Sequence, residues 1–390
     1  MNVPELMNAF ARGDTVFVKG EGARLWDKEG NEYLDALAGI AVCGLGHAHP
    51  GITQAICDQA HTLTHCSNLF YNEPQQSLAK KLCDLSGMDN VFFSNSGAEA
   101  NEAALKIARK YGHQKNIDVP TVIVMDNSFH GRTMATLSAT GNAKVREWFQ
   151  PWVEGFIHVP FNDLQAVIDA GKNNPNVVAV FVEPIQGEGG INIPAENYLS
   201  ELRKLCDSND WLLMLDEIQS GMGRTGKFFA YQHSDFFPDV VTVAKGLGNG
   251  FPIGACLAKG KASRVIEPGN HGTTFGGNPL ACHTAETVLD IIANENLMER
   301  ATVLGNKLLE GFKKRLANNT IVTDIRGHGL LVGIELSKNC AELAQRGLAQ
   351  GIVINVTAGK VVRLLPPLII SDEQADIIIE KVSSLIDDFQ

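Results

Sequence analysis

The sequence lacks the features that mark secreted, membrane-bound and nucleic-acid-binding proteins. Its first residues carry Glu5 and Asp14 and contain no apolar core of signal-peptide length, so we do not expect secretion. No run approaches the roughly 18 apolar residues of a membrane-spanning helix, because glycines, histidines and a proline interrupt even the longest uncharged stretch, residues 36–57. Basic runs are also missing from a chain with 33 Lys and Arg against 44 Asp and Glu, a net charge of −11. This balance argues against binding to nucleic acids or membrane surfaces.

Paired cysteines are absent as well. The eight cysteines are scattered over 390 residues without a CxxC pair, which indicates reduced thiols and a cytoplasmic location rather than a disulfide framework. Cys57, His61 and His65 recur at helical spacing. Cys66 lies beside them, but no second cluster of ligands accompanies the group. We therefore interpret these residues as core cysteines with surface histidines and expect no metal site.

The residues that are present describe an ordinary globular chain, with 44% apolar and 20% charged residues. Its length predicts two or three domains. Between about residues 91 and 260, short and continuously apolar runs alternate with helix-like stretches, as expected for strands buried on both faces. This part predicts an α/β domain with a mostly parallel sheet. The runs are VFFSNS (91–96), TVIVMD (121–126), VVAVFVEPI (177–185), WLLMLDEI (211–218), VVTVAKG (240–246) and IGACLAK (253–259), and the helical stretches are 98–111 and 198–209.

The two flanks predict smaller elements. Residues 15–35 have the pattern of short antiparallel strands, residues 279–318 that of two amphipathic helices, and residues 321–390 that of a small α+β unit. The last helix begins at Ser371, with Gln374 three residues on as in a capping box. No linker separates these parts, so we expect them to pack together. The expected domains are an N-terminal segment that packs with the small domain (1–45), a large α/β domain (46–284) and a small C-terminal α+β domain (285–390).

Where the first apolar run ends, the sequence SNSGAEANE (94–102) leads directly into a helical stretch. In an open α/β sheet, ligands bind beyond the carboxyl ends of the strands. Ser96 and Glu99 have the spacing of a capping box, which accounts for them as a helix start. Ser96, Gly97 and Ala98 also present free backbone N–H groups at the positive end of a helix, which suits a phosphate. The residues alone leave both interpretations open.

Two charged residues close neighbouring apolar runs. Asp216 follows WLLML, where a carboxylate is costly unless a cation or hydrogen-bond donors meet it. It is either a turn cap near the surface or a buried anion that holds a protonated partner. Lys245 lies between an apolar run and a glycine-rich turn. It either extends into solvent or sits in an apolar pocket, where a lysine has a lowered pKa and can form a Schiff base with a carbonyl.

Two arginines also stand in unusual places. Arg132 follows Phe129-His130-Gly131 after the run TVIVMD, and Arg363 lies inside the apolar sequence VVRLLPPL. An arginine in such a place is either part of an internal ion pair or a receptor for a carboxylate. Glu183 or Glu188 would be natural partners for an internal pair.

A glycine-rich loop, GMGRTG (221–226), matches a dinucleotide-binding pattern, and GMGRTGKF is close to a phosphate-binding P-loop. The residues that follow lack helical periodicity, and Phe228 stands where a P-loop needs Ser or Thr. Both interpretations therefore fail on context, and a nucleotide-dependent enzyme that uses this loop remains a remote alternative.

Seven motifs stand in the order found in class III pyridoxal-phosphate-dependent aminotransferases. The chain resembles this family from roughly residue 15 to its C-terminus, and this ordered set of motifs is highly specific for the family. The resemblance implies the type I fold of pyridoxal-phosphate-dependent transferases, in which both chain ends build a small α+β domain beside the large one. The motifs are SGAEANE, FHGRT, EPIQGEGG, LDEIQSGMGRTG, AKGLGNGFPIGA, HGTTFGGNPLAC and VVRLLPPL.

The resemblance assigns the cofactor, pyridoxal 5′-phosphate, to particular residues. It implies that Lys245 binds the cofactor as a Schiff base and is the catalytic base and acid, and that Asp216 pairs with the ring nitrogen. Many relatives have SGTEA where this chain has SGAEA, so the phosphate contact at Ala98 rests on the backbone. The other implied cofactor contacts are Ser96 and Gly97 at the phosphate, Phe129 stacked on the ring, Gln219 near the ring hydroxyl, and Thr274, which would reach the phosphate from the neighbouring subunit.

The resemblance also implies the substrates and the partner. Arg363 would bind the α-carboxylate of glutamate or 2-oxoglutarate, and Arg132 the second carboxylate or that of acetylornithine. Glu188 would pair with Arg363 when the substrate lacks the first carboxylate, and Thr273 would lie near the substrate. The implied ping-pong reaction moves the distal amino group of N2-acetyl-L-ornithine to 2-oxoglutarate, a step of arginine biosynthesis, in a homodimer with shared active sites. Succinylornithine, ornithine and 4-aminobutyrate are alternative amine donors.

Overall fold

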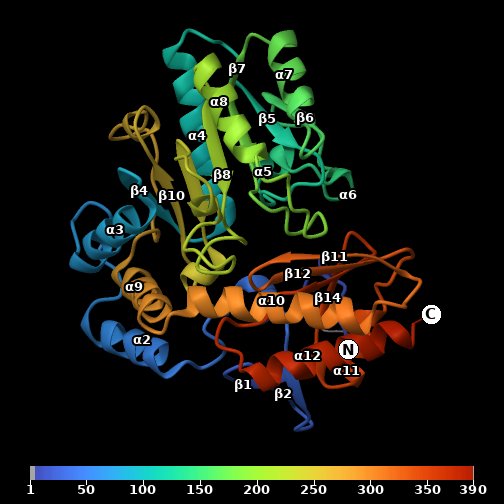
Figure 1. The fold of residues 1–390 in the computed structure, drawn as a ribbon. Helices are drawn as coiled ribbons and strands as arrows, with labels where there is room; N and C mark the ends of the chain where they lie inside the picture. The colour runs from blue at the N-terminus through green and yellow to red at the C-terminus, as the bar shows by residue number, and fades with distance from the viewer. Residues whose placement is uncertain (1–4, 390) are drawn as a thin grey trace.

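A seven-stranded sheet forms the centre of the fold in this computed structural model, which describes residues 5–389 (Figure 1). Strands β9, β8, β7, β5 and β6 pair in parallel, whereas β10 runs antiparallel to both of its neighbours, β9 and β4. The prediction of an α/β fold with a mostly parallel sheet is therefore confirmed. In sheet order the strands are β4 (Asn90–Ser94), β10 (Gly254–Ala258), β9 (Val240–Val243), β8 (Leu212–Asp216), β7 (Val177–Val182), β5 (Thr121–Met125) and β6 (Phe156–Val159).

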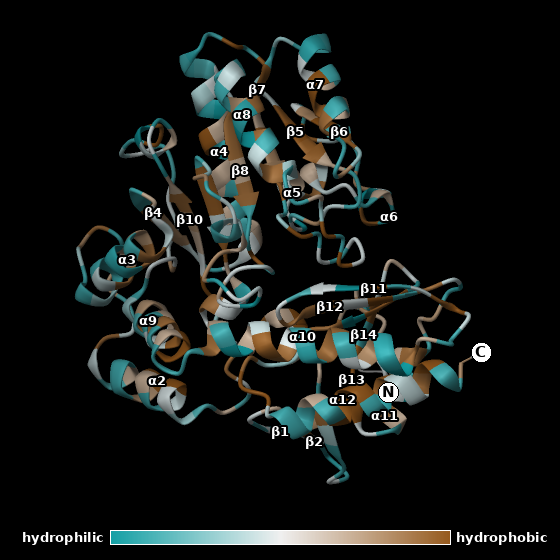
Figure 2. Ribbon diagram, in the orientation of Figure 1, coloured by the Kyte–Doolittle hydropathy of each residue, from teal (hydrophilic) through white to brown (hydrophobic). Residues whose placement is uncertain are grey.

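Helices cover both faces of this sheet, which explains why its strands are continuously apolar. Leu212 and Met214 of β8 pack in one core with helix α4 (Gly97–Gln114), while Leu213 and Leu215 pack in another with α8 (Tyr198–Asn209) and α7 (Leu164–Asn173). Successive side chains of a strand point to opposite faces, so both sets must be apolar. In Figure 2 the central strands are hydrophobic and the outer faces of the covering helices hydrophilic.

Two smaller sheets lie outside the central one, the first built from both chain ends and the second from the C-terminal part alone. In the first, the N-terminal strand β3 pairs in parallel with the C-terminal strand β13, and in the second all pairings are antiparallel. The domain boundaries after residues 45 and 284 stay a prediction, and residues 1–4 and 390 of the end domains lie outside the described residues. The strands are β1 (Phe17–Glu21), β2 (Arg24–Asp27), β3 (Glu32–Asp35) and β13 (Ile352–Val353) in the first sheet, and β11 (Val322–His328), β12 (Leu331–Leu336), β15 (Val361–Leu364) and β14 (Asn355–Thr357) in the second.

The remaining helices pack around these sheets. Helix α12 begins as predicted, because the Ser371 hydroxyl accepts from the Gln374 N–H and the Gln374 side chain accepts from the Ser371 N–H. No helix within residues 5–389 is long and apolar enough to cross a membrane. The remaining helices are α1 (Ala38–Ala41), α2 (Pro50–Thr62), α3 (Glu73–Ser86), α5 (Met134–Ala139), α6 (Ala143–Arg146), α9 (Pro279–Asn294), α10 (Leu297–Arg315), α11 (Leu343–Ala349) and α12 (Asp372–Asp387).

The interpretation of Cys57 as a core residue is wrong. Helix α2 turns Ile52, Ala55 and Gln59 inward, which leaves Cys57 exposed. The helix ends at Thr62, so His65 does not continue its face. Across the described part of the chain, no group of three or more His, Cys, Asp or Glu residues has the arrangement of a metal site.

Candidate active site

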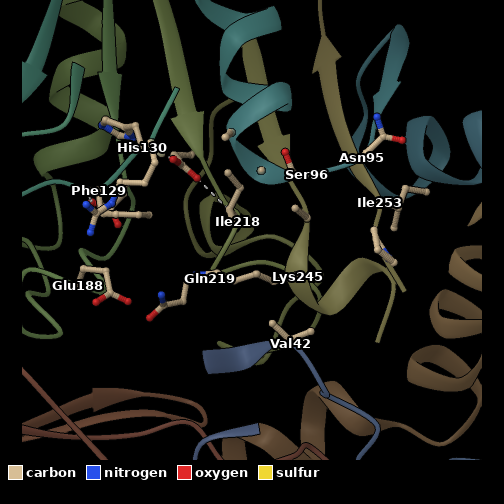
Figure 3. A pocket seen from close by; sticks show the side chains of 18 of the residues that line it. Val42, Asn95, Ser96, Phe129, His130, Glu188, Ile218, Gln219, Lys245 and Ile253 are labelled. Atoms are coloured by element: carbon tan, nitrogen blue, oxygen red, sulfur yellow. Dashed lines mark hydrogen bonds and ion pairs between the residues drawn. The ribbon is translucent and has the colours of Figure 1, made fainter. Parts of the chain in front are cut away.

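Most of the predicted site residues meet in one cavity of about 400 Å³. It lies where β8 and β9 end and α4 begins, at the carboxyl edge of the parallel strands, as expected for this class of sheet (Figure 3). Arg363 reaches its edge from the neighbouring small sheet by bonding to Glu188. The predicted residues that line the cavity are Ser96, Gly97, Ala98, Phe129, Arg132, Glu188, Asp216, Gln219 and Lys245.

Lys245 is positioned by the turn that follows β9. Its backbone has a left-handed φ of 44°, which is rare for a residue with a side chain and marks a locally strained conformation. In Figure 3 its side chain extends toward Gln219 and Glu188. Burial lowers the pKa of the Lys245 ammonium, and although the Glu188 carboxylate opposes this shift, the Arg363 guanidinium adds to it. The amine is thus more easily deprotonated than an exposed lysine.

Asp216 ends β8 as a buried carboxylate, so it is not a turn cap near the surface. The residue is 4% exposed, and its Oδ2 accepts a hydrogen bond of 2.8 Å from Asn101 Nδ2 and lies 2.8 Å from His130 Nδ1. Its Oδ1 accepts from the N–H of Ile218. These partners fix the orientation of a carboxylate that faces the cavity.

The N-terminus of α4 points into the same cavity. The Ser96 hydroxyl accepts from the Glu99 N–H at 3.2 Å, as a capping residue does. The second half of the expected capping box differs, because the Glu99 carboxylate accepts from the N–H and the side-chain amide of Asn95 instead of from the Ser96 N–H. A Cβ on Gly97 would lie 2.7 Å from Ile218 Cδ1, so the glycine allows this helix end to pack closely on the Ile218 side of the cavity.

Glu183 is a second buried carboxylate of the cavity. It accepts from the backbone N–H groups of Phe129 (3.2 Å) and Gly187 (3.3 Å). Burial, followed by the charge of Asp216, raises the pKa of Glu183 to about 8. Of the two glutamates that the sequence offered as partners for an arginine, Glu183 instead accepts from backbone N–H groups. Its raised pKa means that it stays neutral more readily than an ordinary glutamate.

Arg363 and Glu188 form the internal ion pair that the sequence allowed. The Arg363 side chain is 1% exposed, and its Nη1 donates to Glu188 Oε1 at 2.6 Å and to Gln219 Oε1 at 3.4 Å. Burial alone would raise the pKa of Glu188, but the nearby guanidinium outweighs it and holds that pKa below the usual value. The pair is also partly open, because the Glu188 side chain is 30% exposed.

Arg132 remains available at the mouth of the cavity. It is exposed, and its guanidinium carbon lies 5.6 Å from the centre of the Phe129 ring. Among the described residues, no carboxylate lies within ion-pair distance of Arg132. A free guanidinium at a cavity mouth can bind a carboxylate of an incoming ligand.

Thr273 and Thr274 do not join this cavity within one chain. Thr273 Oγ1 accepts from the Gly276 N–H at 3.1 Å and from the Asn95 side chain at 3.4 Å, and Thr274 is exposed. Both residues line a separate hollow with Glu99 and Lys106. Thr274 does not line the cavity of its own chain, and its contact with the phosphate of a neighbouring subunit stays a prediction.

Sequence reasoning missed three residues that orient the site. Asn101 and His130 hold Asp216, and Asn355 holds Arg363 through its Oδ1. Asn101 could have been found, because it lies on the inward face of α4 together with the buried alanines at positions 100, 103 and 104. Nothing in the local sequence marks Asn355, because its partner lies eight residues away across a strand pair.

The cavity fits pyridoxal phosphate by the chemistry of its groups. A lysine with a lowered pKa suits an aldehyde, and a buried carboxylate suits a protonated ring nitrogen. A helix N-terminus with free N–H groups suits a phosphate. Gly97 lets the start of α4 lie against Ile218, which also lines the cavity.

The glycine-rich loop 221–226 has a different task from nucleotide binding. Arg224 is 2% exposed and donates to the carbonyl oxygens of Leu330 and Pro366, so the loop joins the central part of the chain to its C-terminal part. The loop is followed by the short 3₁₀ helix η1 (Ala230–His233) instead of an α-helix whose N-terminus would face a phosphate.

Comparisons with known proteins agree with this site. The model of the family described as aminotransferase class-III matches residues 9–386. A curated acetylornithine aminotransferase from Nitrosomonas europaea is 55% identical over 381 residues, which cover 98% of this chain and 97% of that protein.

Solved structures of the same kind share the fold. A structure of ornithine aminotransferase from Toxoplasma gondii, with pyridoxal phosphate at partial occupancy in its active site, is 38% identical and has a TM-score of 0.93. The match covers 96% of this chain and 91% of that one. A structure of N-acetylornithine aminotransferase from Stenotrophomonas maltophilia is 37% identical, with a TM-score of 0.84 and coverage of 97% of each chain.

Proposed function

Because the chain belongs to the class-III aminotransferase family, we propose that it moves the distal amino group of N2-acetyl-L-ornithine to 2-oxoglutarate. The products are N-acetyl-L-glutamate 5-semialdehyde and L-glutamate, and the reaction serves arginine biosynthesis. The chain is a pyridoxal-phosphate-dependent transaminase. The observation that carries the choice of substrates is the Arg363–Glu188 pair beside Lys245, because one site must bind a dicarboxylate and a monocarboxylate amine in turn.

Three parts of the cavity would hold the cofactor. When bound, pyridoxal phosphate supplies an aldehyde that takes up the amino group and a ring that withdraws electrons. Lys245 would bind the aldehyde carbon, and Asp216, oriented by Asn101 and His130, would keep a proton on the ring nitrogen. The N–H groups of Gly97 and Ala98 at the start of α4 would bind the phosphate, with Ser96 beside them, while Phe129 would contact the ring and Gln219 its hydroxyl.

Lys245 would also carry the proton of the reaction. Its lowered pKa increases the fraction of neutral amine, which a general base requires. From the cavity wall it can take a proton from the substrate carbon that bears the reacting amine and later return one as the ammonium. The strained left-handed backbone at this residue supports a role that demands one fixed position.

The two arginines would sort the substrates. Arg363 would bind the α-carboxylate of 2-oxoglutarate or glutamate after Glu188 has moved aside, and Arg132 would bind the second carboxylate. In the other half-reaction Glu188 would keep Arg363 paired, while Arg132 would bind the carboxylate of acetylornithine and Thr273 would lie near the substrate. The partly exposed Glu188 supports this exchange, because a pair with an accessible acid can be opened by a competing carboxylate.

The active protein would be a cytoplasmic homodimer in which Thr274 of one subunit reaches the phosphate of the other. Support comes from an apolar surface at the two segments beside Thr274. Leu69, Phe70, Tyr71 and Phe275 are between 61% and 89% exposed. Asn68 ties these segments together by donating to the carbonyl oxygens of Thr273 and Gly276. Large exposed apolar patches mark interaction sites.

A donor comparison tests this function. Purified protein with added pyridoxal phosphate and 2-oxoglutarate is given N2-acetylornithine, N2-succinylornithine, ornithine or 4-aminobutyrate, and the products are identified by mass spectrometry. We expect semialdehyde and glutamate in equal amounts, with the highest kcat/KM for N2-acetylornithine. A higher kcat/KM for another of these amines would keep the transaminase and replace the proposed donor.

A further inference from the structure

Acceptors of two chemical kinds hold the buried guanidinium of Arg363, namely the side-chain amides of Asn355 and Gln219 and the carboxylate of Glu188. Asn355 Oδ1 accepts from Nε at 3.1 Å and from Nη2 at 2.8 Å, while Glu188 Oε1 accepts from Nη1 at 2.6 Å. The amide of Asn355 is neutral and the carboxylate of Glu188 is charged. Glu188 therefore neutralises Arg363, and Asn355 binds it without changing its charge.

The short strand β14 places both acceptors. Asn355 lies directly opposite Arg363 in the antiparallel pair of β14 and β15. Thr357 stands two residues further along, on the same face of the strand, and its hydroxyl donates to the backbone carbonyl of Glu188. One strand thus fixes the guanidinium through Asn355 and the backbone of the exchangeable acid through Thr357.

A neutral acceptor at this position has a specific consequence. A guanidinium offers five N–H donors, and its bidentate bonds to carboxylates depend on orientation. Asn355 orients the group by its Nε side and leaves the positive charge for whichever carboxylate occupies the Nη1 side. An acid at position 355 would instead neutralise Arg363 permanently, and a substrate carboxylate would gain little from displacing Glu188.

We propose that Asn355 is a positioning residue that determines specificity, because it keeps Arg363 oriented but charged for the α-carboxylate of the dicarboxylate substrate. This inference rests on the proposed function. It predicts that the charge at position 355 controls binding of the dicarboxylate and leaves the amine donor, which meets Arg363 already paired with Glu188, almost unaffected.

The test uses Asn355→Asp in the holoenzyme, an almost isosteric change that adds a fixed negative charge. Isothermal titration calorimetry with glutarate, an unreactive dicarboxylate of the length of 2-oxoglutarate, measures binding alone. We expect Kd for glutarate to rise roughly ten-fold or more, while the rate constant of the half-reaction with N2-acetylornithine changes by less than about three-fold. The matched control is Asn209→Asp, which adds the same charge at an exposed residue at the end of α8. The Kd of this variant for glutarate should stay within about two-fold of the wild-type value.

Two results would overturn the inference. One is an unchanged Kd for glutarate in Asn355→Asp. The other is a loss of glutarate affinity matched by an equal loss in the rate constant of the half-reaction with N2-acetylornithine, which a purely structural role in pairing β14 with β15 would produce. If Asn355→Asp does not fold, Asn355→Leu removes the acceptor without adding charge. Its Kd for glutarate should still rise about three-fold or more with the amine half-reaction preserved, and an unchanged Kd overturns the orienting role.

Failure of the proposed function would look different. A wild-type holoenzyme that does not react with N2-acetylornithine would refute the proposed donor. The comparison of glutarate binding between wild type and Asn355→Asp would still report on Asn355, because it needs no amine donor.

Discussion

Arg363 and Glu188 form a 2.6 Å ion pair at the cavity that also contains Lys245. The arginine is almost completely buried, whereas the glutamate remains partly exposed. A buried charge is costly without a partner, so we propose that Glu188 stabilises Arg363 until a substrate carboxylate replaces it. Such an exchange would let one site serve two substrates of different charge.

The first prediction concerns this pair. Arg363→Ala should slow the half-reaction with 2-oxoglutarate by roughly 100-fold or more, because removing one partner of a buried, charge-assisted contact costs several kcal/mol. The half-reaction with N2-acetylornithine should suffer much less. Rapid mixing of each substrate with the matching cofactor form of the enzyme measures the two rates separately. Equal damage to both would contradict the exchange of carboxylates at Arg363.

A second prediction concerns the pH dependence of stability. The pKa of Glu183 is raised from 4.5 to about 8 in the folded chain, so its stabilising contribution is fully present below pH 4.5 and is lost as the pH rises through 8. Glu183→Gln removes this titration while it keeps the shape and an acceptor. When the pH rises from 5 to 8, the free energy of unfolding of the wild-type apoenzyme should therefore fall further than that of the Glu183→Gln apoenzyme. The difference should be on the order of a few kcal/mol.

Urea denaturation of both apoenzymes at the two pH values measures this difference. Burial also raises the pKa of Glu217, to about 7, but this group is present in both proteins and cancels in the comparison. An identical pH dependence of wild type and Glu183→Gln would show that Glu183 titrates like an ordinary glutamate.

A third prediction separates the transaminase from the nucleotide-dependent alternative. Lys227 would be the phosphate-binding lysine of a P-loop, yet it is exposed and the loop before it is fixed by Arg224 to the C-terminal part of the chain. Lys227→Ala should leave transaminase kcat/KM within about two-fold of wild type, as surface substitutions usually do. A loss of more than ten-fold would reopen a role for this loop in catalysis.

The sequence was sufficient to predict the large sheet for a physical reason. Strands covered by helices on both faces must be apolar throughout, so six of the seven could be recognised as continuous runs. Strand β6 was not predicted, because it is a four-residue strand at the sheet edge and is only half-buried. A short and partly exposed strand carries neither a continuous nor an alternating apolar pattern.

The site was predictable where one element supplies both the residue and its setting. Asp216 ends the apolar strand β8, Lys245 closely follows the apolar strand β9, and Ser96 caps the start of α4, so their unusual positions are visible in the sequence. Asn101, His130 and Asn355 were missed because their function depends on partners brought near only by folding. Asn101, for example, meets Asp216 across 115 positions of the chain.

The central claim is that Lys245 holds pyridoxal phosphate and that N2-acetylornithine reacts there. The most direct measurement is the near-visible absorption spectrum of the purified protein with added cofactor, before and after N2-acetylornithine is supplied without a keto acid. We predict a yellow Schiff-base band that bleaches with this amine far more readily than with ornithine or 4-aminobutyrate. The Lys245→Ala variant should show neither this band nor turnover. A wild-type protein with no such band, or a Lys245→Ala variant with near-normal turnover, would contradict the account.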